Sequence, residues 1–215
     1  MAKNNNGKLN KNGKLPDYSL EMSAINKGFQ YIAGVDEVGY GPGAGPVVAA
    51  AVIIPNGHVK TLLEAGKVKD SKKLTAKRRE EAYEDLVKVC NYGIGIINND
   101  IIDEINILEA TRLAMSKAVY DLESCDYLLI DGRVELRTTI PQRQIIKGDN
   151  KSISVAAASI VAKVTRDNIM RSLHKKFPIY DWDKNKGYLT KSHLTALKKY
   201  GPCPYHRLSY KRVGK

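Results

Sequence analysis

The chain has 215 residues, of which 43% are hydrophobic and 27% are charged. This composition excludes a disordered protein, and no run of about 18 uncharged apolar residues is present that could cross a membrane. Lys and Arg number 35 against 23 Asp and Glu, which gives a formal net charge of +12. A surplus of this size predicts a polyanionic partner, for which nucleic acid is a better candidate than anionic lipid.

The cysteines and the first residues bear on the compartment and the domain limits. Cys90, Cys125 and Cys203 are an odd number without C-x-x-C spacing, so neither a disulfide framework nor a zinc site is predicted, and we expect a reducing cytoplasm. Four lysines precede the first acid, Asp17, and no apolar signal segment is present. We therefore expect a flexible basic tail over residues 1–18 and one domain over 19–215.

The hydrophobic pattern alternates between strands and helices. Apolar runs at 31–36 and 46–54 predict two neighbouring buried strands, and a helix follows over 75–89 with Thr75 as its N-cap. A strand over 92–97, a helix over 100–122, a strand over 127–130 and a short strand over 144–146 come next. An Ala-rich helix over 152–173, capped by Ser152 or Ser154, and an amphipathic helix over 190–200 complete an α/β protein.

A glycine-rich segment separates the first two strands. Gly39, Gly41 and Ala44 match the dinucleotide-binding pattern G-x-G-x-x-G/A, but that pattern must open a helix. Pro42, Pro46 and the β-branched run that follows favour a hairpin-like turn instead. The segment is therefore not expected to bind a dinucleotide.

Carboxylates follow the ends of three predicted strands: Asp36 and Glu37 after the first, Asp131 after 127–130, and Asp149 after 144–146. Each acid taken alone is compatible with an ordinary turn or cap residue. Together they suggest a carboxylate cluster, which stays ionised near neutral pH only with cations between its members. Oxygen ligands without His or Cys favour Mg²⁺ or Mn²⁺.

Five segments, in order, resemble the ribonuclease HII (type 2 RNase H) family: GVDEVGYGPGAGPVVAAAVI, VKDSKKLTAKRRE, LLIDG, IIKGDNKSISVAAASIVAKVTRD and NKGYLTKSHLTALKKYGPCPYHR. The resemblance runs from about Tyr31 to Val213. It implies an RNase H-like fold, with a mixed central β-sheet flanked by helices and a helical C-terminal extension that closes over the substrate. It also implies that Asp36, Glu37, Asp131 and Asp149 are catalytic residues that hold two Mg²⁺ or Mn²⁺ ions.

The same resemblance implies substrate-binding residues. These are the turn residues Gly39, Tyr40 and Gly41, the backbone-contacting lysines Lys72 and Lys73, and Tyr188, which would stack on the sugar after the ribonucleotide. Read without the resemblance, the lysines are compatible with solvated residues and Tyr188 with a turn aromatic that packs on the core. Asp167 is either a supporting acid near the site or a salt-bridge partner of Arg166 or Arg171.

One position departs from the family pattern. The family's usual glycine-arginine-glycine turn is Gly39-Tyr40-Gly41 here, so the glycines that allow close approach are kept while the arginine charge is lost. A tyrosine cannot hold a phosphate bidentately. The departure predicts weaker recognition of a single ribonucleotide, or a preference for longer RNA.

The predicted activity is hydrolysis of the RNA strand of RNA–DNA hybrids and incision at ribonucleotides embedded in duplex DNA, by a monomer without membrane association. Two-metal-ion catalysis leaves a 5′-phosphate and a 3′-OH. An RNase H-like DNA nuclease such as a resolvase, and an inactive nucleic-acid-binding homologue, are the alternatives. A metal-free ribonuclease is disfavoured, because His58, His174, His193 and His206 show no helpful pairing in the sequence.

Overall fold

The computed structural model describes residues 15–214 and confirms the α/β class with a mixed sheet. The sheet has five strands in the order β3-β2-β1-β4-β5. β1 pairs antiparallel with β2 and parallel with β4; β2–β3 is antiparallel and β4–β5 is parallel. The strands are β1 (Ile32–Val38), β2 (Val47–Ile53), β3 (Asn91–Ile97), β4 (Tyr127–Asp131) and β5 (Gln142–Ile145).

The four predicted helices are present, and three further helices, two near the N-terminal end and a four-residue one before the last helix, were not predicted. The helices are α1 (Ser19–Ile25), α2 (Asn56–Ala65), α3 (Ala76–Val89), α4 (Asn99–Tyr120), α5 (Ile153–Lys176), α6 (Trp182–Asn185) and α7 (Lys191–Tyr200), with 3-10 turns at Ser71–Lys73, Gly148–Asn150 and Pro178–Tyr180. α2 escaped prediction because it begins with Asn56-Gly57, which reads as a turn, and buries only Leu62.

α4 is not the continuous helix that the sequence predicted. Asn106 has a φ of 68° and interrupts the helix. Its side-chain oxygen accepts hydrogen bonds from the backbone N–H groups of Leu108 (2.9 Å) and Glu109 (3.1 Å), so it caps the segment that follows. These two side-chain hydrogen bonds offset the cost of the positive φ, so the chain bends here without a glycine.

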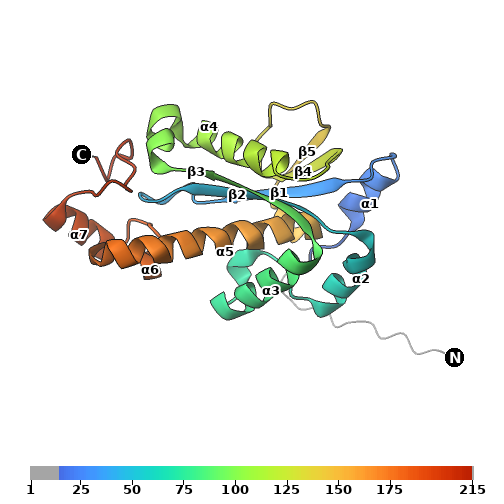
Figure 1. Cartoon of the computed structure of the whole chain (residues 1–215), viewed down its shortest axis with the longest axis horizontal. Coiled ribbons are helices and arrows are strands. Elements are labelled where there is room, and N and C mark those ends of the chain that lie inside the picture. Colours follow the sequence, from blue (N-terminus) through green and yellow to red (C-terminus); the bar gives the residue numbers. More distant parts are fainter. Residues whose placement is uncertain (1–14, 215) are drawn as a thin grey trace.

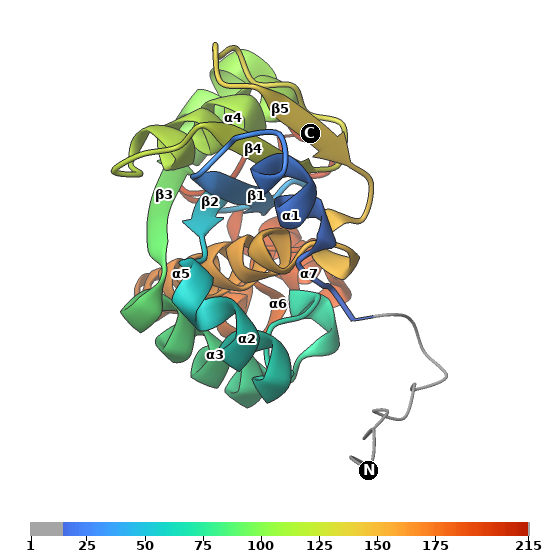
Figure 2. The same cartoon turned by 90° about the vertical axis from the view of Figure 1, so that its right-hand side faces the viewer.

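The sheet lies between two helical layers (Figures 1 and 2). α4 covers one face, and α5 covers the other with α3 and α2 outside it. Glycines allow both long helices to approach the strands closely: a Cβ at Gly95 would lie 1.9 Å from the Ala114 carbonyl oxygen, and one at Gly34 would lie 2.1 Å from Ser154 C. All seven residues of β2 are buried between these layers.

α5 is anchored at its start by a buried acid. Ser152, rather than Ser154, is the N-cap, since its hydroxyl accepts from Val155 N. The Glu21 carboxylate of α1 accepts from both serine hydroxyls at 2.5 Å. Asp17 forms a β-bridge with Ser152, so ordered contacts begin inside the segment that we assigned to the tail; residues 1–14 of that segment lie outside the described residues.

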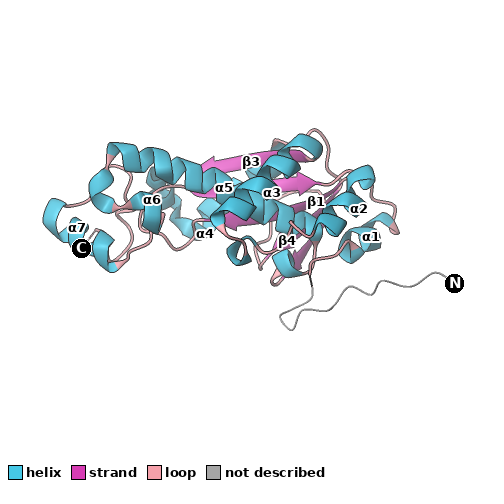
Figure 3. Cartoon of the chain, turned by 90° about the horizontal axis from the view of Figure 1, so that it is seen from below, coloured by secondary structure: helices cyan, strands magenta, loops and turns pink. Residues whose placement is uncertain are grey.

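The C-terminal part packs around the end of α5, beyond the sheet. Figure 3 shows α6 and α7 gathered at that end of the molecule. A separate apolar cluster includes Trp182 and Tyr180 together with Met170 of α5 and Ala44 of the β1–β2 connection. The helical C-terminal part is therefore tied directly to the glycine-rich turn. In the part of the chain that the structure describes, no helix has the length and apolarity needed to cross a membrane.

Candidate active site

Sheet register brings the first three acids together. Val35 of β1 is paired with Ile130 of the parallel strand β4, so Asp36 and Asp131 follow at neighbouring positions on the same edge. Asp36 is 6% exposed and its carboxylate accepts from Glu37 N at 2.8 Å. This meeting of strand ends is the arrangement that the sequence pattern suggested.

Asp149 joins the cluster from the turn that precedes α5. The neighbouring Gly148 donates its N–H to Asp131 Oδ1 at 2.6 Å, which fixes the turn against β4. Asn150 Nδ2 donates to Asp149 Oδ1 at 2.7 Å. Three separate segments thus deliver four carboxylates to one place.

The electrostatics show that the acids act on one another. Burial, followed by the charges of Glu37 and Asp131, raises the pKa of Asp36 well above its usual range, although a hydrogen bond from Ser159 opposes the shift. Burial and Asp131 raise the pKa of Glu37 to about 7. Burial and then Asp70 raise the pKa of Asp149. A positive charge placed among these groups would stabilise their ionised forms.

The donor chemistry fits a hard divalent cation. All four groups are carboxylates, and oxygen ligands of this kind suit Mg²⁺ or Mn²⁺. Within residues 15–214, however, no three His, Cys, Asp or Glu side chains converge closely enough to hold an ion as they stand.

The two predicted lysines lie beside the acids and differ in their surroundings. Asp70 caps their 3-10 turn by accepting from Lys72 N at 3.0 Å. Burial opposes the charge of Lys72, but the carboxylates led by Asp36 and Asp149 outweigh it and raise the pKa of this lysine. Lys73 donates to Asn150 Oδ1 and lies 3.7 Å from Asp70. Lys72 is therefore the lysine whose ammonium group is stabilised by the negative charges of the carboxylate cluster.

Asp167 makes ion pairs, but with neither of the two partners considered from the sequence. Lys163 Nζ lies 2.7 Å and Arg79 Nη1 lies 3.6 Å from its carboxylate. Arg79 in turn donates to the carbonyls of Ser71 (2.8 Å) and Leu74 (2.9 Å), which frame the lysine turn. Asp167 is thus connected to Lys72 and Lys73 through Arg79.

The glycine-rich segment is a turn between antiparallel strands, so the dinucleotide interpretation was correctly set aside. Gly39 has a φ of 101°, and a Cβ there would lie 2.4 Å from Arg166 Nε, so no other residue fits. Tyr188 lies on the other side of the turn, with its ring 3.6 Å from where a Cβ on Gly41 would stand. Tyr40 and Tyr188 are 47% and 48% exposed, so Tyr188 is not a core aromatic.

Two buried arginines behind this turn were missed in the sequence. Arg166 donates to the carbonyls of Ala44 (3.1 Å) and Pro46 (2.9 Å), and Arg207 donates to those of Gly45 (3.0 Å) and Tyr40 (3.2 Å). Both side chains are 0% exposed. A charged residue carries no sequence signal for such a position, because arginines are usually exposed.

Two of the four histidines pair in the fold, which the sequence did not indicate. His193 Nε2 and His206 Nε2 lie 2.9 Å apart, and Trp182 Nε1 donates to His193 at 3.3 Å. Thirteen positions separate the two histidines in sequence, so only the folded C-terminal part brings them together. Among the described residues, neither of these histidines forms a hydrogen bond with a carboxylate of the cluster. The pair therefore gives no support to metal-free acid–base catalysis.

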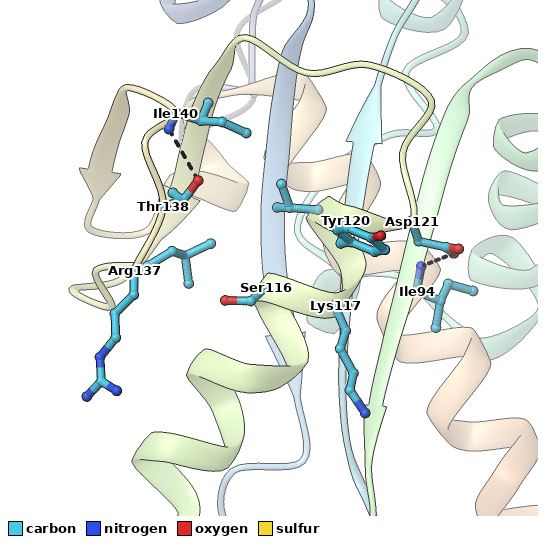
Figure 4. A pocket seen from close by; sticks show the side chains of 10 residues that line it. Ile94, Ser116, Lys117, Tyr120, Asp121, Arg137, Thr138 and Ile140 are labelled. Carbon is cyan, nitrogen blue, oxygen red and sulfur yellow. Dashed lines mark hydrogen bonds between the residues drawn. The ribbon is translucent and has the colours of Figure 1, made fainter.

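Two pockets are relevant to the location of the site. One, of about 580 Å³, lies between the second half of α4 and the loop before β5 (Figure 4). Because Leu128 pairs with Gln142 at the start of both strands, this pocket is at the opposite end of β4 from Asp131. The other, of about 550 Å³, adjoins the turn and is lined by Gly41, Tyr188, Leu189, Thr190, Tyr210, Lys211 and Arg212.

Comparison with known proteins identifies the family. The sequence profile of the family described as ribonuclease HII matches residues 33–213. The ribonuclease HII of Syntrophobacter fumaroxidans is 53% identical over 193 residues, which cover 89% of this chain and 81% of the relative. That of Chlamydia caviae is 54% identical over 195 residues, covering 89% of each chain.

Solved structures give the same result. The ribonuclease H2 of Pyrococcus horikoshii superposes with a TM-score of 0.73 at 27% identity, covering 86% of this chain and 96% of that one. The ribonuclease HII of Archaeoglobus fulgidus, solved in complex with PCNA, gives a TM-score of 0.73 at 28% identity, covering 85% and 96%. With the profile match and these relatives, the chain belongs to the ribonuclease HII family.

Proposed function

We propose that the protein hydrolyses the RNA strand of RNA–DNA hybrids and incises duplex DNA at embedded ribonucleotides. Asp36, Glu37, Asp131 and Asp149 would hold two Mg²⁺ or Mn²⁺ ions. The observation that carries the proposal is the meeting of these four carboxylates from three segments in a chain of the ribonuclease HII family. Divalent ions held by these carboxylates would supply an activated water and stabilisation of the departing 3′-oxygen, a chemistry that would leave a 5′-phosphate and a 3′-OH.

The protein groups around the acids would orient them for this chemistry. Ser159 donates to Asp36, and Gly148 N–H holds Asp131, so both carboxylates have a fixed neighbour before any ion arrives. Asn150 does the same for Asp149. Lys72 brings an ammonium group close to the cluster, where it can contact a substrate phosphate.

Substrate recognition would use the glycine turn and Tyr188. The absence of a side chain at Gly41 lets a sugar approach the backbone closely, whereas the absence of one at Gly39 makes room for Arg166 and so allows the tight turn. The 2′-OH is the group that distinguishes RNA from DNA. The ring of Tyr188 stands next to Gly41, where it can stack on the following sugar. Lys73 and a supporting Asp167, acting through Arg79, would complete the backbone contacts.

We propose that the protein is a monomer, and that it is located in the cytoplasm, a location that the three free cysteines of the described residues support. The basic tail, residues 1–18, would add nonspecific contacts to the nucleic-acid backbone next to the domain 19–215, in keeping with the net charge of +12.

A three-substrate assay tests the function. The protein is incubated in Mg²⁺ or Mn²⁺ with three substrates: a DNA duplex that contains one ribonucleotide, a full RNA–DNA hybrid and an all-DNA duplex. The Asp131→Asn variant is the control. Cleavage of the first two and not the third is expected. Cleavage of the all-DNA duplex would indicate a DNA nuclease, whereas binding without any cleavage would indicate an inactive homologue.

A further inference from the structure

His206 and Arg207 are consecutive residues of the C-terminal segment, and both are buried, with exposures of 1% and 0%. His206 reaches the loop that contains Tyr188 through His193, and Arg207 contacts the turn that contains Tyr40 directly. His206 also forms a β-bridge with Ala44 of the same turn. Together they link the turn to the loop, beside the direct bond from Gly43 N to Gly187 O at 2.9 Å and the bond from Arg166 Nη1 to Lys186 O at 2.9 Å.

Arg207 donates hydrogen bonds to backbone carbonyl groups of the turn over residues 39–45, here called the Tyr40 turn. Its Nη1 donates to Tyr40 O at 3.2 Å and to the Tyr210 hydroxyl at 2.9 Å, and this hydroxyl donates to Tyr40 O at 2.8 Å. Its Nε donates to Gly45 O at 3.0 Å, and its backbone N–H donates to Gly43 O at 2.9 Å. With its carbonyls engaged on this side, the turn has a fixed position relative to the C-terminal segment.

His206 is linked through His193 to the loop over residues 186–190, here called the Tyr188 loop. The hydrogen bonds of the two imidazole rings determine which nitrogen of each ring carries the proton. Cys203 N donates to His206 Nδ1 at 2.9 Å, so the neutral ring carries its proton on Nε2. That proton is donated to His193 Nε2 at 2.9 Å, so His193 carries its own proton on Nδ1 and donates it to Tyr188 O at 3.0 Å. Burial lowers the pKa of both histidines, which keeps this neutral chain intact.

We propose that His206 and Arg207 are positioning residues that fix the separation between the Tyr40 turn and the Tyr188 loop, and thereby set the preference for a single embedded ribonucleotide over a long hybrid. The inference rests on the proposed function. A single ribonucleotide offers one 2′-OH and must meet both sides of the pocket at once, whereas a hybrid offers a ribonucleotide in every register. An error in the separation therefore penalises the single site more strongly.

Substitutions at His206 distinguish positioning from mere packing. His206→Gln keeps an amide donor near the position of Nε2, whereas His206→Asn keeps an acceptor near Nδ1 and loses the donor to His193. For the Asn variant, the ratio of kcat/KM on the single-ribonucleotide duplex to kcat/KM on the hybrid should fall about tenfold, mainly through KM. The Gln variant should stay within about twofold of the wild-type ratio. Equal ratios in all three proteins would overturn the proposal.

A milder variant keeps the test independent of folding. Tyr210→Phe removes only the hydroxyl between Arg207 and Tyr40 O, and should lower the same ratio about threefold without changing the thermal midpoint appreciably. Tyr120→Phe is the matched control, because Tyr120 is 92% exposed and lies on α4, and it should leave the ratio unchanged. A Tyr210→Phe ratio equal to that of wild type would count against the proposal.

A binding measurement separates this inference from the proposed function. In an Asp131→Asn background, fluorescence anisotropy gives the affinity for the single-ribonucleotide duplex relative to an all-DNA duplex, without cleavage. This preference should fall about threefold when Tyr210→Phe is added. An unchanged preference refutes the positioning role, whereas absence of cleavage by the wild-type protein refutes the proposed function alone.

Discussion

Substituting Glu21 by Gln tests how the start of α5 is held next to Asp149. Glu21 is 1% exposed, and its Oε1 accepts from Ser152 Oγ and Ser154 Oγ at 2.5 Å and from Ser154 N at 3.1 Å. The carboxylate also faces the N-terminus of a 24-residue helix, where negative charge is favourable. Ser152 follows Asp149 by only three positions, so this anchor supports the carboxylate cluster.

The expected loss of stability follows from these contacts. A hydrogen bond to a charged group contributes about 1 kcal/mol more than one to a neutral group, so three bonds account for about 3 kcal/mol. The helix terminus adds about 0.5 kcal/mol. A neutral amide avoids the cost of burying a charged carboxylate, which restores about 1–2 kcal/mol of the free energy of unfolding. Glu21→Gln should therefore lower the free energy of unfolding by about 2 kcal/mol, or Tm by about 4–8 °C for a chain of this size.

Urea unfolding at neutral pH measures this change, with the fluorescence of Trp182, the single tryptophan, as the signal. Glu84→Gln is the control, because Glu84 is an exposed residue of α3 and the substitution should change stability by less than about 0.5 kcal/mol. If Glu21→Gln is as stable as wild type within that margin, the carboxylate charge does not anchor α5 and the reasoning is refuted.

Four further predictions concern the site and its surroundings. Asp131→Asn should keep the far-UV spectrum and reduce kcat in Mg²⁺ at least about 100-fold; wild-type turnover at saturating metal would show that Asp131 is not a ligand. Deletion of residues 1–15 removes four lysines and should reduce the salt slope of hybrid binding by up to about 3.6 while cleavage continues; a folded but inactive truncation would contradict a merely accessory tail. Tyr40→Arg adds about 1.5–3 kcal/mol of charge-assisted interaction before losses, so kcat/KM should rise more for a single ribonucleotide than for a hybrid, and an equal change in both would count against this. Burial, with the charge of His193, lowers the pKa of His206 to about 4, so the unfolded state binds a proton between pH 6.5 and 4 that the folded state does not. Stability should fall by about 2 kcal/mol from this residue between pH 6.5 and 5, and urea unfolding of His206→Gln should lack that part of the decline.

The sequence predicted what depends on local pattern. The run that ends in Asp36 and the run that ends in Asp131 each show a buried strand followed by an acid, and parallel pairing of those strands was enough to bring the acids together. Thr75 and Ser152 were identifiable as N-caps because a hydroxyl before a helical pattern is a local signal. The fold class followed from the order of these elements.

The features that were missed depend on contacts between distant segments. Arg166 and Arg207 donate to carbonyls more than 100 positions away, and the pairing of His193 with His206 requires α7 to pack against the final segment. The break at Asn106 is different, since its cause is local, yet asparagine is common enough in helices that one residue does not predict it. Backbone carbonyls as partners for buried charges have no sequence signature at all.

α5 has a consequence for how the enzyme tolerates change. On this one helix, Ser159 lies seven positions before Arg166 and eight before Asp167. Ser159 contacts Asp36, Arg166 contacts the glycine turn, and Asp167 reaches the lysine turn through Arg79. Adding one residue between Ser159 and Arg166 would rotate the second half of the helix by about 100° relative to the first. The carboxylate cluster, the glycine turn and the lysine turn would then lose their common alignment even if each half of the helix still formed. In this enzyme α5 sets the relative orientation of three separate groups along its length. The number of residues in the helix is therefore as constrained as their identity.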